Sequence, residues 1–170
     1  MWCRLNHVAL LADGDWIESK DQAHAGFRLI QTGNIGKCEF LPHDERARYI
    51  SKETFSKLNC TEIFPGDCLI SRLPDPLGRA CIVPFSHERM ITAVDCTITR
   101  PFKTVLFTLY FTGTTIYSEY VEKNATGSTR KRISRANLDK TLLPLPPLAE
   151  QKRIVSQVEK LFSVLETMRG

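Results

Sequence analysis

A run of prolines divides this chain into two parts that must fold differently. Residues 142–147 read Leu-Leu-Pro-Leu-Pro-Pro. Proline fixes φ and has no amide donor, so it is excluded from helix interiors and from central strands. We therefore predict an extended connector here. A domain over residues 1–143 precedes it, and a different element occupies residues 144–170.

The element after the connector has the pattern of a pairing helix. From Leu148 to Arg169 the sequence holds neither glycine nor proline. Apolar residues recur at alternating steps of four and three, the spacing of a coiled-coil seam: Ile154, Val158, Leu161, Leu165 and Met168. Such a helix would extend roughly 30 Å, and about two heptads are marginal for independent pairing. The seam either pairs with a second helix or folds back onto its own domain, and the proline connector favours pairing.

The first 143 residues read as a mixed α/β domain. Short segments rich in Val, Ile, Leu and Thr, separated by turn residues, predict strands over 5–11, 26–32, 67–71, 79–83 and 90–99. Residues 51–59 predict a short helix with Ser51 as its cap and with Phe55 and Leu58 facing inward. Residues 104–122 have the composition of a strand and the apolar spacing of a helix, and we predict a helix.

The net charge of the chain is concentrated in one segment. The 170 residues carry a formal charge of +4. Residues 127–140 contain one acid and five basic side chains, namely Arg130, Lys131, Arg132, Arg135 and Lys140, so the rest of the chain is balanced. Ser128 and Thr129 add two hydroxyl donors directly before the basic run. Hydroxyls and guanidinium groups suit phosphate oxygens, which predicts a phosphate-binding loop. A solvated turn is the alternative.

Two further clusters carry side chains of the type that read base edges. Sequence-specific reading requires paired donors and acceptors in a groove. The first cluster is Arg28, Gln31, Thr32 and Asn34, and the second is Arg72, Asp75 and Arg79. Each follows an apolar segment and runs into glycine or proline, where a strand ends and side chains become available for contact. We predict base contacts from both clusters.

Disulfide, metal and membrane chemistry is not predicted. The six cysteines form no CxxC pair, and the four histidines do not complete a zinc set at short spacing. We expect reduced cysteines that pack as small apolar side chains. The longest apolar run near the start, residues 8–12, is far below the roughly 20 residues of a membrane span. A soluble cytoplasmic protein is the expectation.

Several of these segments carry a resemblance to a known family. Residues 145–155, Leu-Pro-Pro-Leu-Ala-Glu-Gln-Lys-Arg-Ile-Val, and 127–134, Gly-Ser-Thr-Arg-Lys-Arg-Ile-Ser, closely resemble the specificity subunits of type I restriction-modification enzymes. Residues 28–35, 66–71 and 94–98 extend the resemblance in the order of that family, so it covers nearly the whole chain. The resemblance implies a mixed α/β target recognition domain that reads one half of a split double-stranded DNA target. The start of a conserved spacer helix follows that domain.

The resemblance also implies two protein partners. One is a methyltransferase subunit that binds S-adenosylmethionine and methylates adenine, and the other is a motor-nuclease restriction subunit. Catalysis, together with S-adenosylmethionine, ATP and Mg²⁺, is expected only in those subunits and not in this chain. The family normally has two recognition domains, whereas this chain has one. It is therefore a fragment or a half-subunit that dimerises through the seam from Ile154 to Met168.

Other functions remain open from the sequence. The same DNA-contacting residues would serve a stand-alone DNA-binding regulator, and the terminal helix alone would serve an assembly module. A metal-dependent nuclease has less support, because Asp75, Glu150 and Lys152 lie in a predicted loop and at a helix start rather than on adjacent strands. No P-loop and no Asn/Asp-Pro-Pro-Tyr/Phe tetrad occurs in the sequence.

Overall fold

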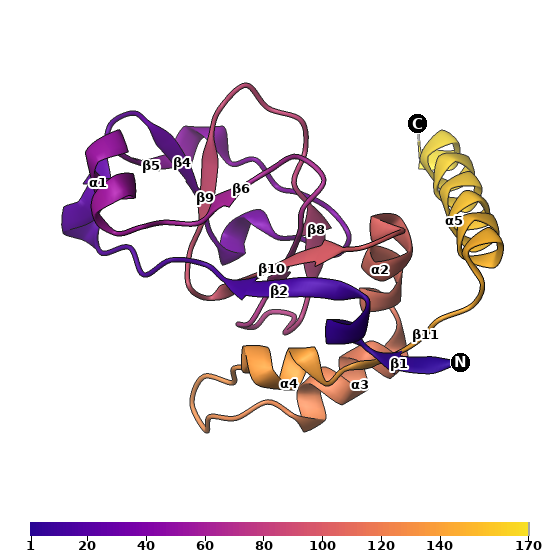
Figure 1. Ribbon diagram of the computed structural model, residues 1–170. Helices are drawn as coiled ribbons and strands as arrows, with labels where there is room; N and C mark the ends of the chain where they lie inside the picture. The colour runs from indigo at the N-terminus through magenta and orange to yellow at the C-terminus, as the bar shows by residue number, and fades with distance from the viewer. Residues whose placement is uncertain (170) are drawn as a thin grey trace.

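The computed structural model describes residues 1–169, which form three β-sheets with helices around them (Figure 1). The strands are β1 (Trp2–Arg4), β2 (Ala9–Asp13), β3 (Gln22–Ala23), β4 (Phe27–Ile30), β5 (Arg48–Ile50), β6 (Glu62–Ile63), β7 (Cys68–Ser71), β8 (Ala80–Ile82), β9 (Met90–Thr92), β10 (Cys96–Pro101) and β11 (Leu142–Pro144). The helices are α1 (Lys52–Lys57), α2 (Val105–Thr112), α3 (Thr115–Lys123), α4 (Arg135–Asp139) and α5 (Leu148–Arg169), together with the short 3₁₀ turns η1 (Leu5–His7), η2 (Ser19–Asp21), η3 (Thr32–Asn34) and η4 (Asp44–Arg46).

The two larger sheets share an apolar core. One has the strand order β3-β5-β4-β9-β6, and the other has the order β2-β10-β7-β8. A buried cluster takes Ile30 and Ile63 from the first sheet and Leu69, Cys81 and Ile98 from the second, so it joins them. Strands β4 and β9 run parallel. Their carboxyl ends therefore reach the same edge of the sheet, and the loops that follow them lie near one another.

Helices cover the outer faces of both sheets. Side chains alternate along a strand, so Cys68 and Ile70 of β7 face away from Leu69 and pack against α2, α3 and α4. Helix α1 covers the five-stranded sheet, where the rings of Phe55 and Phe27 stack with centroids 4.1 Å apart. The protein therefore has a helix layer on each side of a two-sheet core.

The strands predicted around β4, β7 and β8 are confirmed, and two other strand predictions are wrong. Residues 90–99 form two strands, β9 and β10, which belong to different sheets. The chain turns at residues 93–95, where the Cys96 amide donates to the Ala93 carbonyl at 2.9 Å. Residues 5–7 form the 3₁₀ turn η1, and the strand begins only at Ala9. Neither break contains glycine or proline, which explains why the apolar pattern did not reveal them.

The helix predictions hold with two corrections. Ser51 caps α1 by accepting a hydrogen bond from the Thr54 amide at 3.1 Å, as predicted. Phe55 faces inward, but Leu58 is 38% exposed, so its predicted burial is wrong. Residues 104–122 are helical as predicted, although α2 and α3 are separate helices with a break at Gly113.

The proline connector begins as an edge strand. Strand β11 pairs antiparallel with β1 and places Pro144 opposite Trp2. A two-stranded sheet consists of edge strands only, and an edge strand tolerates proline. The connector therefore returns the chain to its own N-terminus before α5 begins. The domain boundary at residue 143 stays a prediction.

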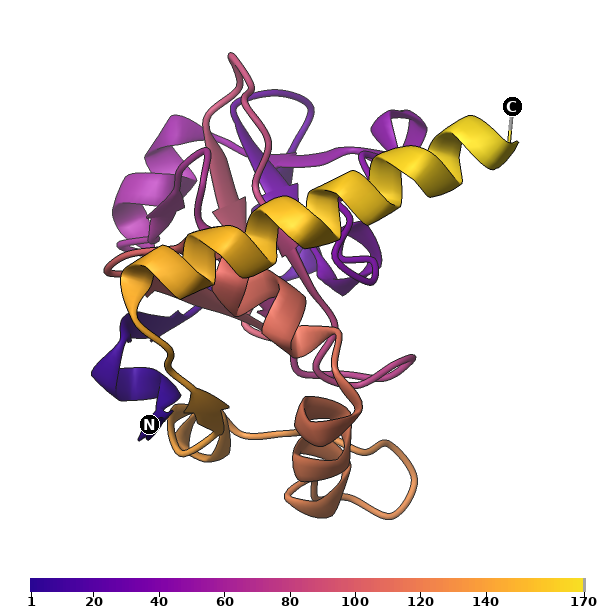
Figure 2. The same cartoon turned by 90° about the vertical axis from the view of Figure 1, so that its right-hand side faces the viewer.

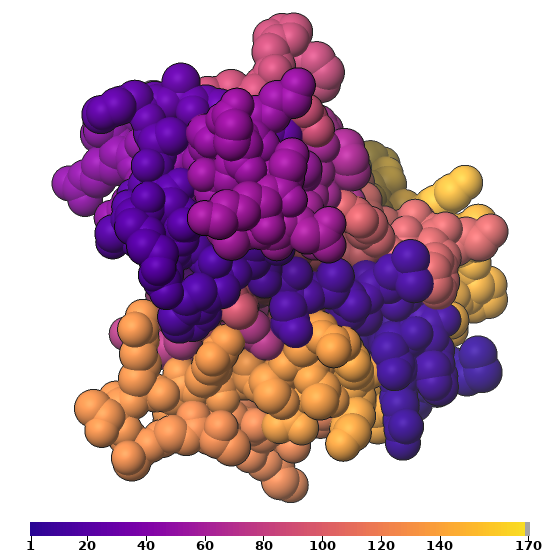
Figure 3. Space-filling view, turned by 60° about the vertical axis from the view of Figure 1, so that its left-hand side comes forward, coloured from indigo at the N-terminus to yellow at the C-terminus, as the bar shows by residue number. Residues whose placement is uncertain are grey.

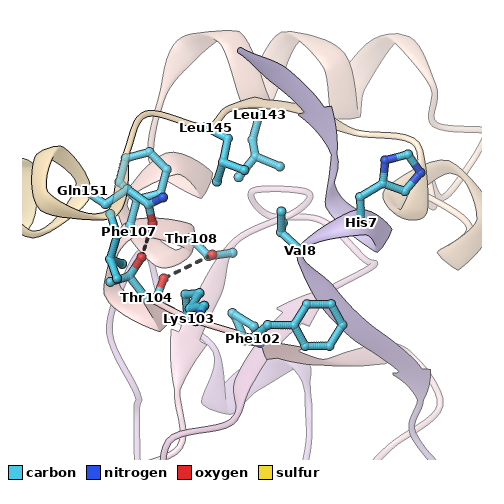
Figure 4. A pocket seen from close by; sticks show the side chains of 12 residues that line it. His7, Val8, Phe102, Lys103, Thr104, Phe107, Thr108, Leu143, Leu145 and Gln151 are labelled. Carbon is cyan, nitrogen blue, oxygen red and sulfur yellow. Dashed lines mark hydrogen bonds between the residues drawn. The ribbon is translucent and has the colours of Figure 1, made fainter.

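The first half of α5 packs on the domain rather than standing apart from it. Figure 2 shows α5 crossing over α2. The contact extends into the second half of the helix, where the rings of Phe162 and Tyr110 lie 5.9 Å apart. Gln151 is 6% exposed and donates to the Pro146 carbonyl at 2.9 Å, while its side-chain oxygen accepts from the Thr104 hydroxyl. An apolar pocket of about 240 Å³ lies at this junction (Figure 4). The expected separation of helix and body is therefore wrong for this half.

The predicted seam is exposed in the second half of α5. Leu161, Leu165 and Met168 are 65%, 53% and 78% exposed. Ile154 packs against the core of the domain, and Val158 lines a groove between α5 and the body. The predicted seam is thus divided between intramolecular contact and an open apolar face. Among the described residues, no helix has the length and apolar character needed to span a bilayer.

Candidate nucleic-acid interface

Arg28 is held by acidic side chains of two loops. Its side chain is 11% exposed, and its guanidinium lies 2.6 Å from an Asp44 oxygen and 3.0 Å from a Glu88 oxygen. It also donates to the Pro42 carbonyl. These contacts fix the loop before β5 and the loop before β9, the two strands that pair with β4. A base contact by Arg28 stays a prediction, and it would require exchange of at least one of these bonds.

Gln31, Thr32 and Asn34 form the turn at the carboxyl end of β4. The Asn34 side chain closes this turn by accepting from the Gln31 amide at 2.9 Å and donating to the Leu41 carbonyl at 2.8 Å. The three residues line a polar pocket of about 320 Å³. Asn34 therefore shapes the turn, whereas Gln31 and Thr32 are half-buried at the wall of an open pocket.

The same pocket contains basic residues that sequence reasoning missed. His43, Arg46 and Arg48 line it together with the predicted residues. They lie in the segment His-Asp-Glu-Arg-Ala-Arg, where acids and bases cancel and no charge excess is visible. Arg46 and Arg48 are both exposed, so the pocket opens toward guanidinium groups. Only the fold shows that they adjoin the turn after β4.

Arg79 donates its hydrogen bonds to backbone carbonyls of two separate segments. Its terminal nitrogens bond the Thr32 carbonyl at 2.8 Å and the Leu73 and Pro76 carbonyls at 3.1 and 3.0 Å. Its Nε donates to the Ile35 carbonyl. The turn after β4 and the loop after β7 are therefore bridged by a single guanidinium. A base contact by Arg79 stays a prediction that would require breaking this bridge.

Arg72 joins the basic segment through a shared acid. It is only 5% exposed, and its guanidinium lies 3.0 Å from Asp13, which also lies 3.1 Å from Arg135. Burial lowers the pKa of Arg72, and nearby Arg132 lowers it further, while Asp13 opposes both effects. Arg132 in turn lies 3.0 Å from Asp95. Two arginine sets that are far apart in sequence thus meet at one shared carboxylate, that of Asp13.

A chain of hydrogen bonds links segments of the three predicted clusters to one another. The Thr32 carbonyl is bonded to Arg79, which is bonded to the Leu73 carbonyl. The neighbouring Arg72 carbonyl accepts from the Ile133 amide at 3.2 Å. We call the surface formed by residues 31–35, 72–79 and 127–132 the recognition face. In Figure 3 the orange segment that contains residues 127–132 projects at the lower edge of the molecule.

The basic loop is a tight hairpin with exposed cations. Thr126 and Arg132 exchange two backbone hydrogen bonds of 2.8 and 2.9 Å. Ser128, Thr129 and Arg130 are exposed at its tip. Lys131 lies 2.7 Å from Glu122 in a pair exposed to solvent. Exposed pairs of this kind contribute roughly 0–1 kcal/mol, so they exchange readily for a phosphate partner.

Gly127 is required by the geometry of this hairpin. Its φ is +104°, and an added Cβ would lie 2.5 Å from the Arg130 carbonyl oxygen. We expect Gly127→Ala to lower the free energy of unfolding by about 1 kcal/mol and to displace the loop, because alanine is strained at positive φ. Thermal unfolding measures this effect. Gly33→Ala is the control, because a Cβ there meets nothing within 4 Å. Equal melting temperatures for the two variants would contradict the prediction.

Four of the six free cysteines are buried, and the other two are half-buried. Burial raises the pKa of Cys60 and Cys96 to about 11 and that of Cys81 to about 12. Protonated thiols are poor metal ligands and poor nucleophiles. Within residues 1–169, no three His, Cys, Asp or Glu side chains come together as a metal site would require. Glu150 of the conceivable nuclease signature pairs instead with Arg153 at 2.7 Å on α5.

Comparison with known protein families identifies the chain. Residues 4–170 match the family described as "Type I restriction modification DNA specificity domain". The chain belongs to this family. The match covers the recognition face and α5 together, so the resemblance of the separate sequence segments is confirmed.

Curated relatives of this specificity domain are specificity subunits from Escherichia coli. The chain is 29% identical over 77 residues to the type I restriction enzyme EcoKI specificity subunit of strain K12, covering 44% of the chain and 17% of that subunit. It is 37% identical over 54 residues to the EcoBI specificity subunit, covering 32% of the chain and 11% of that subunit. These matches span less than a fifth of either relative.

Solved structures confirm the fold of the specificity domain. A chain from a structure titled for complex assembly and conformational transition of the type I R-M system superposes with a TM-score of 0.74 at 22% identity, covering 99% of this chain and 39% of that one. The HsdS subunit from Thermoanaerobacter tengcongensis gives a TM-score of 0.70 at 22% identity and covers 100% of this chain and 40% of that subunit. The predicted mixed α/β domain followed by a long helix is therefore confirmed. The chain spans about two fifths of each solved relative.

Proposed function

We propose that this specificity domain reads one half of a split double-stranded DNA target as the specificity subunit, or half-subunit, of a type I restriction-modification system. The recognition face carries the proposal. Hydrogen bonds link the predicted base-reading turn, through Arg79 and the loop at residues 72–79, to Ile133 beside the basic hairpin. A protein that reads a DNA sequence needs phosphate contacts and base-edge contacts together. Phosphate contacts fix its register on the duplex, and base-edge contacts supply sequence discrimination.

Different parts of the recognition face suit different DNA groups. The hairpin side chains from Ser128 to Arg132 suit phosphates, and the exposed Arg46 and Arg48 extend the positive surface beside the polar pocket. Gln31 and Asp75 suit base edges, because amides pair with adenine and carboxylates accept from cytosine amino groups. Asp75 is exposed at the tip of the loop after β7. A carboxylate there would repel phosphate, which favours contact with bases.

The proposed partners are the two catalytic subunits of such a system. A methyltransferase subunit would bring S-adenosylmethionine and modify adenine, and a restriction subunit would bring ATP and Mg²⁺. In this proposal the present chain is non-catalytic, binds no cofactor and works in the cytoplasm. Its family membership supports this division of labour.

We further propose that two copies of the chain pair through the open half of α5. The chain covers 39% and 40% of two solved relatives, so two copies approach the length of one such protein. Leu161, Leu165 and Met168 form an exposed apolar strip on one face of α5. An antiparallel contact through this strip would be isologous and would close after two copies.

Charge in the seam is expected to prevent this pairing. Leu161→Asp combined with Leu165→Asp should convert a dimer into a monomer, because pairing would bury two unpaired carboxylates on each copy. Light scattering coupled to size exclusion measures the mass. Ser156→Asp with Ser163→Asp adds the same charge on the opposite face of the same helix and should leave the mass unchanged. A double seam variant that retains the wild-type dimer mass would contradict the pairing.

Selection from a random duplex pool tests the DNA-reading function. The purified chain is incubated with randomised duplexes at near-physiological salt, and the bound fraction is sequenced. The proposal expects enrichment of a short half-site, and a two-fold repeat of it if the chain pairs. Failure to enrich any sequence would contradict reading by this chain alone and would favour an assembly role for α5. Co-purification with a methyltransferase subunit separates the restriction-modification function from a stand-alone regulator.

A further inference from the structure

We propose that Arg79 is a positioning residue that locks two DNA-reading loops into one rigid unit. This inference rests on the proposed function and assigns Arg79 a role other than the base contact expected from the sequence. The loops in question are the turn at residues 31–35 and the loop at residues 72–78. The first follows β4 of the five-stranded sheet and the second follows β7 of the four-stranded sheet. They therefore belong to different sheets and need a connection to act together.

The guanidinium of Arg79 supplies that connection on both sides. On the first loop it donates to the Thr32 carbonyl at 2.8 Å and to the Ile35 carbonyl. On the second loop it donates to the Leu73 and Pro76 carbonyls at 3.1 and 3.0 Å. The planar fork of arginine presents donors in fixed directions, so four acceptors on one guanidinium also fix the relative orientation of the loops.

Each loop is already ordered internally, so the bridge joins two preformed parts. In the second loop the Ser71 hydroxyl donates to the Leu73 carbonyl at 3.0 Å, and the buried Tyr117 hydroxyl donates to the Gly78 carbonyl at 3.0 Å. In the first loop the Asn34 side chain closes the turn by accepting from the Gln31 amide. Loss of Arg79 would keep these internal hydrogen bonds but release one loop from the other.

This release would affect sequence reading more than general DNA affinity. Side chains that read adjacent base pairs must be held within about 0.5 Å of their productive positions. Phosphate contacts tolerate greater freedom, and the basic hairpin that provides them is held by its own backbone pairing of Thr126 with Arg132. Arg79 variants should therefore lose base preference while keeping electrostatic binding.

Replacing Arg79 with lysine distinguishes a hydrogen-bonded bridge between the loops from an effect of positive charge alone. Arg79→Lys keeps the positive charge but cannot donate to four carbonyls in a fork. In duplex selection we expect Arg79→Lys and Arg79→Ala to lower the ratio of best-site to random-site affinity by about tenfold for each base pair affected. At least two base pairs should be affected, while the salt dependence stays as in the wild type. Arg153→Lys is the matched control, because Arg153 is exposed on α5 outside the recognition face, and it should leave the base profile unchanged.

Hydrogen exchange without DNA tests the bridge independently of the proposed function. Both Arg79 variants should accelerate amide exchange at residues 31–35 and 72–78 together, with slow exchange retained in β7 and β10. Unchanged exchange, or faster exchange in one loop only, would overturn the bridge. A base profile altered at a single position, or fully retained by Arg79→Lys, would overturn the positioning role. If the wild-type chain enriches no sequence, the proposed function fails, and the exchange result still supports or overturns the bridge.

Discussion

Neutralising the basic hairpin is expected to weaken duplex binding by about two to three orders of magnitude at 0.1 M salt. The variant replaces Arg130, Lys131 and Arg132 with alanine. Each phosphate contact adds roughly 0.9 to the slope of log affinity against log salt concentration, so three lost contacts reduce the slope by about 3. Binding isotherms between 50 and 200 mM salt measure both the affinity and the slope. The loss should be equal for all duplexes, because phosphate contacts carry no sequence information.

A matched variant separates local contact from net charge. Lys52→Ala, Lys57→Ala and Lys160→Ala remove the same total charge from exposed positions on α1 and α5. This control should change the slope little, since these side chains lie outside the recognition face. An equal loss in both triple variants would assign binding to net charge alone. An unchanged slope in the hairpin variant would remove the hairpin from the phosphate role.

Of the proposed variants, Tyr117→Ala is expected to lower the free energy of unfolding most. Its side chain is 1% exposed, packs edge-on against Phe111 with ring centroids 5.7 Å apart, and donates to the Gly78 carbonyl at 3.0 Å. Removing a buried aromatic ring typically costs about 3–5 kcal/mol. Tyr117→Ala should lower the free energy of unfolding by that amount. In a chain of this size, the melting temperature should fall by about 10 °C.

Tyr117→Phe isolates the contribution of the hydroxyl. It keeps the ring and leaves the Gly78 carbonyl without this donor, so we expect a loss of about 1 kcal/mol. Chemical denaturation of the wild type and both variants gives the two differences. If Tyr117→Ala lowers the free energy of unfolding no more than Tyr117→Phe does, the ring does not support the core. That result would also remove α3 as the support of the loop at residues 72–78.

Patterns that are local in sequence predicted much of the fold. The alternating apolar segments located β4, β7 and β8, and the glycine-free stretch located α5. The turn at residues 93–95 was missed because its stability comes from tertiary contact, in which the Val94 amide donates to the Asp15 carbonyl at 2.8 Å. The docking of α5 was missed for a similar reason. Gln151 reads as a polar helix residue, and its burial depends on Thr104 and Pro146.

In the candidate site, too, the sequence revealed the types of residue but not their partners. The sequence indicated which arginines to consider but not which acids they meet. Arg135 pairs with Asp13 across 122 positions of sequence, and Arg28 pairs with Glu88 across 60. The topology of the fold determines partners this distant in sequence. The sequence alone therefore could not show which basic side chains are free for DNA and which are already paired with an acid. Arg46 and Arg48 were missed because their neighbouring acids cancelled their charge.

The docking of α5 fixes the position from which the helix extends away from the domain. Because α5 is anchored on the domain through Gln151 in its first half and through Phe162 in its second, only the end of the second half is free to set a distance in the proposed pairing. Lengthening that half by one heptad would move a subunit bound at its far end by about 10.5 Å along the helix axis. The rise of duplex DNA is about 3.4 Å per base pair. In the proposed pair of copies, one added heptad would therefore correspond to about three base pairs between the two half-sites, with the same helix face still presented.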